Sequence, residues 1–405
     1  MSQRPIISLF TGAGGLDLGL EVAGFDVALA VENEPDCLAT IRKNTDWSIS
    51  STTDVTQVKT KHLLSEAGLK PGEAALVAGG PPCQPFSKAG YWANGDSKRL
   101  NDRRADTITH YFRIVRAALP RAIIFENVRG IGFRDKTEAL GLIETELKKI
   151  NRSHGTKYEP VYLNVNAADF GVPQTRERLF VVANRDGRPF ELPPPTHFPV
   201  ERPEAALSRY TTAWDAIGDL DSIRHGEELS MRGKWSDLLP SVPEGRNYLW
   251  HTRRGGGVPL FGWRTRYWSF LLKLKKSQPS WTLQASPGPA TGPFHWRNRL
   301  LSEREMARIQ TFPDCHEFCG NYRSITRQIG NAVPPAIGEL FGRTMIKQFF
   351  DETMDTSLTF IPKFSKTIPR AHPRRPVPEK FKMRARNPDA HPGNGRGPRA
   401  LSQRS

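Results

Sequence analysis

Short apolar runs alternate with helical segments through the first half of the chain. Compact apolar runs predict buried strands over residues 5–10, 25–31, 74–78, 121–125, 158–165 and 179–184. Apolar residues at helical spacing predict helices over residues 16–24, 107–119 and 137–150. Because strands that alternate with helices form a sheet covered on both faces, this pattern predicts an α/β fold.

The loop after the first strand is rich in glycine and reads Thr11-Gly12-Ala13-Gly14-Gly15. A strand, a glycine loop and a helix begin a nucleotide-type βα unit. The spacing differs from the G-x-G-x-x-G of pyrophosphate binders, but the methionine part of S-adenosylmethionine carries no phosphate. Glu32, at the second strand end, is placed to bind ribose hydroxyls, or is an ordinary strand-end carboxylate. Asp54 and Val55 suit contacts with adenine, unless Asp54 only caps a turn.

A stiff loop follows the strand at 74–78 and contains Gly79-Gly80-Pro81-Pro82-Cys83-Gln84-Pro85-Phe86-Ser87. Prolines restrict the backbone on both sides of Cys83. Open α/β sheets place reactive groups beyond the carboxyl ends of their strands, as here. We interpret Cys83 as a nucleophilic thiolate, and the alternative is a buried structural cysteine beside a proline turn. The charged segment 91–104 is expected to be a mobile loop.

Three charged residues follow the later strands. Glu126 comes directly after the apolar run at 121–125, where burial is expected to raise its pKa and suit it to donate a proton near neutral pH. The alternative for Glu126 is a helix cap or an ion pair. Arg176 and Arg178 stand at alternate positions entering the last strand, so their side chains point the same way. They can present donors to a base or phosphate, or form a solvated charge pair.

Composition narrows the function classes. The 405 residues allow one large and one smaller domain, and a net charge of +16 with a pI near 9.9 favours nucleic acid as the partner over a merely solvated basic surface. Four scattered cysteines fit a reducing cytoplasm better than a disulfide scaffold. The sequence shows no signal peptide and no apolar stretch long enough to span a membrane.

The motifs together resemble the DNA (cytosine-5)-methyltransferases of bacterial restriction-modification systems. They stand in that family's order between about residues 5 and 350. The matching segments are Phe10-Thr11-Gly12-Ala13-Gly14-Gly15, Pro82-Cys83-Gln84, Glu126-Asn127-Val128, Gln174-x-Arg176-x-Arg178, Arg308-Ile309-Gln310-x-Phe312-Pro313 and Gln328-Ile329-Gly330-Asn331-Ala332-Val333-Pro334-Pro335.

This resemblance implies methyl transfer from S-adenosylmethionine to C5 of a cytosine that is flipped out of duplex DNA. Cys83 would add to C6 of the base, and Glu126 would protonate N3 and bind the exocyclic amine. Arg178 would bind O2, Arg176 would support the loop of Cys83 and Glu126, and Ser87 with its loop would close over the base. The base that removes the C5 proton is not identified by the sequence.

The resemblance also implies a cofactor pocket made from both ends of the chain. It predicts that a final helix, roughly 337–350, packs beside the first one. Asn33 departs from the family, since many relatives have an aromatic residue against the adenine there. The expected cofactor-binding residues are Phe10, Gly12, Ala13, Gly15, Glu32, Asp54, Val55, Pro82, Asn331 and Ala332.

The implied fold is a Rossmann-like methyltransferase sheet with helices on both faces, plus a smaller target-recognition domain. We expect a catalytic domain over 1–190, target recognition and hinge over 191–324, a returning segment over 325–352, and a basic disordered tail over 353–405. In the variable region, Arg253, Arg254, Arg264 and Arg266 are candidates for DNA contact; the alternative is a small core with surface arginines.

The expected partners are double-stranded DNA and a cognate restriction endonuclease acting on the same site, with the protein itself a monomer. Two other functions stay open, an RNA (cytosine-5) methyltransferase of the same fold and a non-catalytic DNA-binding module. A zinc deaminase is excluded because its second ligand would fall at Phe86 and no H-x-E motif precedes the loop. A dinucleotide oxidoreductase is disfavoured, because Cys83, Glu126 and the arginine pair would have no role together in such an enzyme.

Overall fold

The computed structural model describes residues 4–82, 106–128, 137–199, 208–223, 226–263, 267–355, 357–365 and 367–386. Cys83, Ser87, Arg264, Arg266 and the charged segment 91–104 lie outside the described residues.

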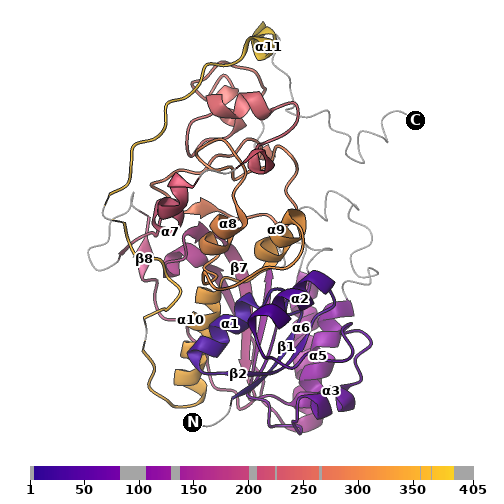
Figure 1. Cartoon of the computed structure of the whole chain (residues 1–405). Helices are drawn as coiled ribbons and strands as arrows, with labels where there is room; N and C mark the ends of the chain where they lie inside the picture. The colour runs from indigo at the N-terminus through magenta and orange to yellow at the C-terminus, as the bar shows by residue number, and fades with distance from the viewer. Residues whose placement is uncertain are drawn as a thin grey trace.

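A six-stranded sheet forms the centre of the large domain, with strand order β2-β1-β3-β4-β7-β5 (Figure 1). The first four strands in this order are parallel, and β7 runs antiparallel to both of its neighbours. All six predicted strands are present. Their bounds are β1 (Pro5–Leu9), β2 (Asp26–Val31), β3 (Leu76–Gly79), β4 (Ala122–Val128), β5 (Val161–Asn166) and β7 (Glu177–Asn184).

The strand order reverses direction at β1, which lies between β2 and β3. Ligands of open α/β sheets bind at such a switch point, outside the carboxyl ends of the strands. The glycine loop leaves β1 at this edge, and the loop that leads to Cys83 leaves β3 beside it. The topology therefore brings together the two loops that sequence analysis selected.

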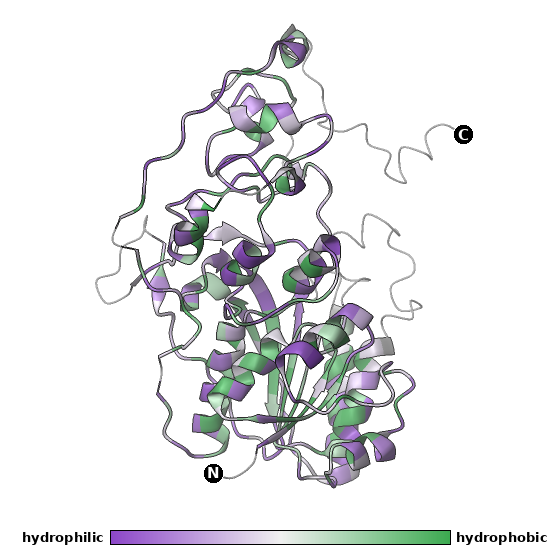
Figure 2. Ribbon diagram, in the orientation of Figure 1, coloured by the Kyte–Doolittle hydropathy of each residue, from purple (hydrophilic) through white to green (hydrophobic). Residues whose placement is uncertain are grey.

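Helices cover both faces of the sheet, as predicted. Because side chains alternate along a strand, Ile7 of β1 packs into one core and Ile6 into the other. The first core is covered by α3 (Thr60–Glu66), α5 (Asp106–Ala118) and α6 (Thr137–His154), and the second by α1 (Gly15–Ala23) and α10 (Pro335–Phe349). Figure 2 shows hydrophobic residues gathered along the strands and the helix faces turned toward them.

The close pairing of α1 with α10 depends on glycine. A Cβ on Gly19 would lie 2.1 Å from the carbonyl oxygen of Pro335, and one on Gly338 would lie 2.3 Å from that of Leu16. No larger residue fits at either position without a shift of the backbone. The prediction that the final helix packs beside the first is confirmed.

A third hydrophobic core lies beyond the sheet, in the upper part of Figure 1. We call the region around it, residues 226–263 and 267–300, the small domain. It has little regular structure, and aromatic side chains such as Trp235, Tyr248 and Phe261 fill its interior. Its elements are η4 (Glu227–Leu229), η5 (Ser236–Ser241), η6 (Tyr248–His251) and β10 (Ser280–Trp281).

A fourth core joins the two domains, and we call it the junction. It contains Ala13 of the glycine loop together with Leu274 and Trp296 of the small domain. The strand β10 also pairs with β6 (Gln174–Thr175) of the large domain. The elements around the junction are α7 (Ala213–Ile217), η3 (Gly218–Ser222), α8 (Glu303–Ile309) and α9 (Tyr322–Asn331). The remaining elements before it are α2 (Pro35–Asn44), η2 (Ala167–Phe170), β8 (His197–Phe198) and β9 (Ser208–Arg209).

The C-terminal segment differs from the expected disordered tail. Residues 357–365 and 367–386, which we call the strap, run from the large domain along the small domain and end in α11 (Glu379–Lys382) and η8 (Met383–Arg386) (Figure 1). Phe381 is buried in the core of the small domain. Sequence analysis missed this because one isolated aromatic residue in a Pro- and Arg-rich stretch gives no periodic signal. Residues 387–405 lie outside the described residues.

Within the described residues, we find no helix whose length and apolar character would let it cross a membrane.

Candidate active site

The glycine loop leaves β1 through a run of left-handed backbone conformations. Phe10 has a φ of 55°, Gly12 of 58° and Gly14 of 79°. A positive φ is unfavourable for a side chain such as Phe10, and such strain gathers at functional sites. No atom of the described residues lies within 4 Å of the place where a Cβ on Gly12 would stand. The loop therefore borders open space at Gly12.

The other end of the glycine loop packs against the segment that returns from the C-terminal part of the chain. A Cβ on Gly15 would lie 2.3 Å from the carbonyl oxygen of Val333 and 3.2 Å from the Cβ of Ala332. Asn331 beside them is exposed, and Ala13 is buried in the junction. Predicted cofactor residues from both ends of the chain thus meet at one place.

Glu32 binds the glycine loop directly. Its Oε2 accepts a 2.6 Å hydrogen bond from the amide of Gly12, and its Oε1 accepts from the amides of Asn33 and Glu34 at 2.9 and 2.8 Å. Burial raises the pKa of Glu32, and these backbone donors oppose that shift. Oε1 already accepts two bonds, but Oε2 accepts one and keeps further acceptor capacity, so the predicted ribose contact stays compatible with these bonds.

Asp54 and Val55 both make contacts within the large domain. Asp54 Oδ1 accepts hydrogen bonds from the amide and hydroxyl of Thr56, at 2.9 and 2.8 Å, so the carboxylate does cap a turn. Val55 is 5% exposed and packs in the core on the α5 side of the sheet. Their contact with adenine stays a prediction.

Glu126 lies inside β4, not after it, because the strand continues to Val128. In the β4–β7 register Glu126 faces Phe180 and Val128 faces Arg178, so Glu126 and Arg178 are diagonal neighbours on one face. Arg178 Nε lies 3.0 Å from Glu126 Oε1. Burial raises the pKa of Glu126, and the charges of Arg178 and Arg176 oppose this shift.

The loop that leads to Cys83 starts beside this glutamate. A Cβ on Gly80 would lie 3.0 Å from Glu126 Oε2, so the backbone of this loop passes close to the carboxylate. Asn127 is 2% exposed, and its Nδ2 donates a 3.2 Å hydrogen bond to the carbonyl of Pro81. The backbone before Cys83 is therefore attached to β4. Sequence analysis gave Asn127 no role, although it lies in the Glu126-Asn127-Val128 motif. Pro82 is exposed.

Arg176 is 1% exposed and holds the returning segment. Its Nη2 donates to the carbonyls of Gly330 and Ala332, at 2.9 and 2.8 Å. Its Nε and Nη1 have no hydrogen-bond partner within the described part of the chain. Arg176 is thus bound to the returning segment, and its positive charge lowers the pKa of Glu126. The expected support of the Cys83 loop by Arg176 stays a prediction.

Comparison with known proteins identifies the family. The chain matches the C-5 cytosine-specific DNA methylase family over residues 5–347. It belongs to this family. The Type II methyltransferase M.SacI of Streptomyces achromogenes is 38% identical over 372 residues, which cover 85% of this chain and 93% of that protein. The Type II methyltransferase M.AquIA of Picosynechococcus sp. is 40% identical over 238 residues, which cover 57% of this chain and 94% of that protein.

The fold agrees with that of solved structures. A prophage-encoded E. coli protein assigned as a DNA modification methyltransferase superimposes with a TM-score of 0.58 at 24% identity, covering 86% of this chain and 100% of the other. The methylase described here is therefore an enzyme of the DNA (cytosine-5-)-methyltransferase class with the expected Rossmann-like architecture.

The small domain of this methylase presents two of the predicted DNA-contact residues. Arg253 and Arg254 are exposed, and Arg254 Cζ lies 5.3 Å from the centre of the Trp263 ring. Stacking on an aromatic ring limits the positions of a guanidinium without removing its charge. Whether these arginines bind DNA stays a prediction.

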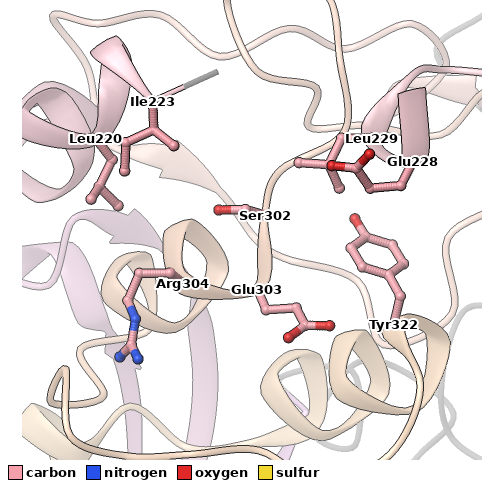
Figure 3. A pocket seen from close by; sticks show the side chains of 8 residues that line it. All are labelled: Leu220, Ile223, Glu228, Leu229, Ser302, Glu303, Arg304 and Tyr322. Atoms are coloured by element: carbon pink, nitrogen blue, oxygen red, sulfur yellow. The ribbon is translucent and has the colours of Figure 1, made fainter. Parts of the chain in front are cut away.

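A pocket of about 410 Å³ lies elsewhere, between the segment around η4 and the helices α8 and α9 (Figure 3). Apolar and polar side chains share its wall. We do not place the methylase reaction there, because the described residues that line it include none of the predicted catalytic residues and no thiol: Leu220, Ile223, Glu228, Leu229, Ser302, Glu303, Arg304 and Tyr322.

Proposed function

We propose that this methylase transfers a methyl group to C5 of a flipped-out cytosine in duplex DNA, through a covalent bond between Cys83 and C6. One observation carries the proposal: Glu126, an acid with a raised pKa, is buried beside the backbone that leads to Cys83. Family membership supports the reaction class.

In this mechanism the Cys83 thiolate adds to C6, and Glu126 gives its proton to N3 of the ring. The electron pair displaced by the addition then makes C5 nucleophilic. Burial favours the protonated acid before this step. Afterwards the carboxylate is stabilised by Arg178, whose Nε lies 3.0 Å from Glu126 Oε1. After methylation, a base takes the C5 proton, Cys83 leaves as the thiolate, and N3 returns its proton to Glu126, which restores the ring.

The residues around the glycine loop fit S-adenosylmethionine. The open space at Gly12 lets a ligand approach the backbone, and Glu32 keeps acceptor capacity beside it. When bound, S-adenosylmethionine would supply the methyl group as a sulfonium and leave as S-adenosylhomocysteine. The residues that would hold it are Phe10, Gly12, Ala13, Gly15, Glu32, Asp54, Val55, Pro82, Asn331 and Ala332.

We further propose that the small domain and hinge select the DNA sequence, with Arg253, Arg254, Arg264 and Arg266 contacting DNA and Ser87 closing over the base. The net charge of +16 supports a polyanionic substrate. The Type II relatives support a role in restriction-modification, with an endonuclease that acts on the same site.

The nucleophile can be tested by Cys83→Ser with bisulfite sequencing of plasmid DNA from expressing cells. Wild-type protein should methylate cytosine at a defined sequence, and Cys83→Ser should abolish methylation while S-adenosylmethionine binding persists. Cys315→Ser is the control, because that thiol is exposed and far along the chain. Methylation by Cys83→Ser at the wild-type level would refute the covalent mechanism. Labelled methyl transfer to tRNA instead of duplex DNA would refute the proposed substrate.

A further inference from the structure

Near its start, the strap donates hydrogen bonds to buried carboxylates of the large domain and the junction. Glu339 of α10 has a fully buried side chain and accepts hydrogen bonds from the amide and hydroxyl of Thr359, at 2.8 and 2.7 Å. Asp215 of α7, also fully buried, accepts a 2.7 Å bond from the amide of Ser365. A buried carboxylate that loses a donor is costly, so these contacts hold the strap in place.

The next contacts complete a buried ion pair in the small domain. Lys276 and Glu244 are 2.5 Å apart, with side chains 3% and 5% exposed. The amide of His372 donates to Glu244 Oε1 at 3.0 Å, and Lys276 Nζ lies 3.5 Å from the carbonyl of Arg370. The backbone of the strap thus supplies one donor and one acceptor to a pair that is shielded from solvent.

The end of the strap enters the core of the small domain. Phe381 is 3% exposed, and its ring stacks on Trp235 at 5.7 Å between centroids and 15° between planes. The amide of Arg375 donates to the carbonyl of Pro240 at 3.0 Å, and Arg374 lies over the ring of Trp250. The ring of Phe381 is therefore part of the aromatic core of the small domain.

We propose that the strap positions the small domain over the catalytic residues, and that Phe381 is a positioning residue for the methylation of DNA. The inference rests on the proposed function, in which the small domain carries the DNA-contacting arginines. In chain order the strap contacts the large domain, the junction and the small domain. The affinity for duplex DNA therefore depends on where the strap holds the arginines of the small domain.

The first test compares Phe381→Ala with Met383→Ala in the full chain. Met383 is 80% exposed and provides a matched control on the same segment. Phe381→Ala should raise KM for duplex DNA by about tenfold and leave kcat and the Kd of S-adenosylmethionine within about twofold, as expected for lost binding without lost chemistry. Phe381→Leu should restore most of the affinity, and Met383→Ala should match wild type. An unchanged KM in Phe381→Ala would overturn the proposal.

The second test needs no catalytic activity. His372→Pro removes the amide that donates to Glu244, whereas His372→Ala keeps it. We expect His372→Pro, and not His372→Ala, to speed amide hydrogen exchange in residues 229–261 while α1 and α10 stay protected. Equal exchange in both variants, or loss of protection in α1 and α10, would overturn the positioning role. An absence of DNA methylation by wild-type protein would instead refute the proposed function and leave this readout intact.

Discussion

At the scale of single residues, two opposing influences act on the pKa of Glu126, the proposed proton donor. Burial favours its protonated form, and Arg178 and Arg176 favour its ionised form. A group that must give up a proton and then stay charged needs both influences. The same residue type on an exposed strand end would have the arginine contact but not the raised pKa.

We expect Glu126→Gln to lower kcat by about 10²–10⁴-fold, because the amide keeps the shape but has no proton to transfer. The pKa of Glu126 is raised, so its protonated fraction falls as pH rises through that value, and wild-type turnover should decline on the alkaline side. Single-turnover methyl transfer against pH would measure both effects. Glu303→Gln is the control outside the site, and a wild-type rate in Glu126→Gln would exclude it as the donor.

Asp17 offers a prediction about stability. It is 2% exposed at the start of α1, its Oδ1 has no hydrogen-bond partner within the described residues, and burial raises its pKa to about 7. A folded pKa above the unfolded value of 3.8 means that stability from this group is present in acid and lost as pH rises toward 7.

Asp17→Asn should therefore stabilise the protein relative to wild type, and its advantage should grow by about 2–3 kcal/mol between pH 5 and pH 8. Urea unfolding at both pH values would measure this difference. Asp46→Asn, at an exposed position, should have nearly the same free energy of unfolding as wild type at both pH values. If Asp17→Asn changed the free energy of unfolding equally at both pH values, the raised pKa of Asp17 would be contradicted.

At the scale of elements, the pairing of α1 with α10 connects the glycine loop to the far end of the chain. Gly15, at the start of α1, packs against Val333, and Gly19 and Gly338 let the helix backbones touch. Because the glycine loop and the returning segment flank one space, any separation of these helices should loosen the cofactor site.

We expect Gly338→Ala to destabilise the protein by about 1–3 kcal/mol, since its Cβ would lie 2.3 Å from the backbone of Leu16. The affinity for S-adenosylmethionine should fall as well. Gly141→Ala in α6 is the matched control, because no described atom lies within 4 Å of its Cβ position. That control should be neutral or stabilising by about 0.5–1 kcal/mol. Thermal unfolding and calorimetric titration would measure both; equal behaviour of the two variants would contradict the packing argument.

At the scale of the whole molecule, the two domains depend on three connections of different kinds. The junction is a cluster of apolar side chains, and β10 and β6 are joined by backbone hydrogen bonds. The strap adds hydrogen bonds from its backbone to the buried carboxylates of Asp215 and Glu244. The net charge of +16 attracts a polyanion to the whole molecule before any specific contact forms.

Binding of duplex DNA should therefore weaken steeply with salt. Raising NaCl from 50 to 200 mM should lower the affinity by about ten- to hundredfold if two to four phosphates are neutralised. Fluorescence anisotropy of labelled duplex DNA would measure this. The Kd of S-adenosylmethionine should change little over the same range, and a salt-independent DNA affinity would contradict the electrostatic contribution.

The amino-acid sequence alone determined the alternation of strands and helices, because hydrophobic periodicity is a local property. It also determined the motif order that identifies the family, including Glu126, Arg176 and Arg178. Local patterns could not show that Asn127 attaches the backbone before Cys83 to β4 or that Arg176 holds the carbonyls of Gly330 and Ala332. Both are contacts between distant parts of the chain.

Only the tertiary structure revealed the contacts of Glu32 and of the strap. The carboxylate of Glu32 meets the amide of Gly12 because β1 and β2 are neighbours in the sheet. Phe381 is buried because an aromatic core far away in the sequence has room for its ring. Burial depends on what surrounds a residue in space, so the Pro- and Arg-rich sequence around Phe381 does not predict it.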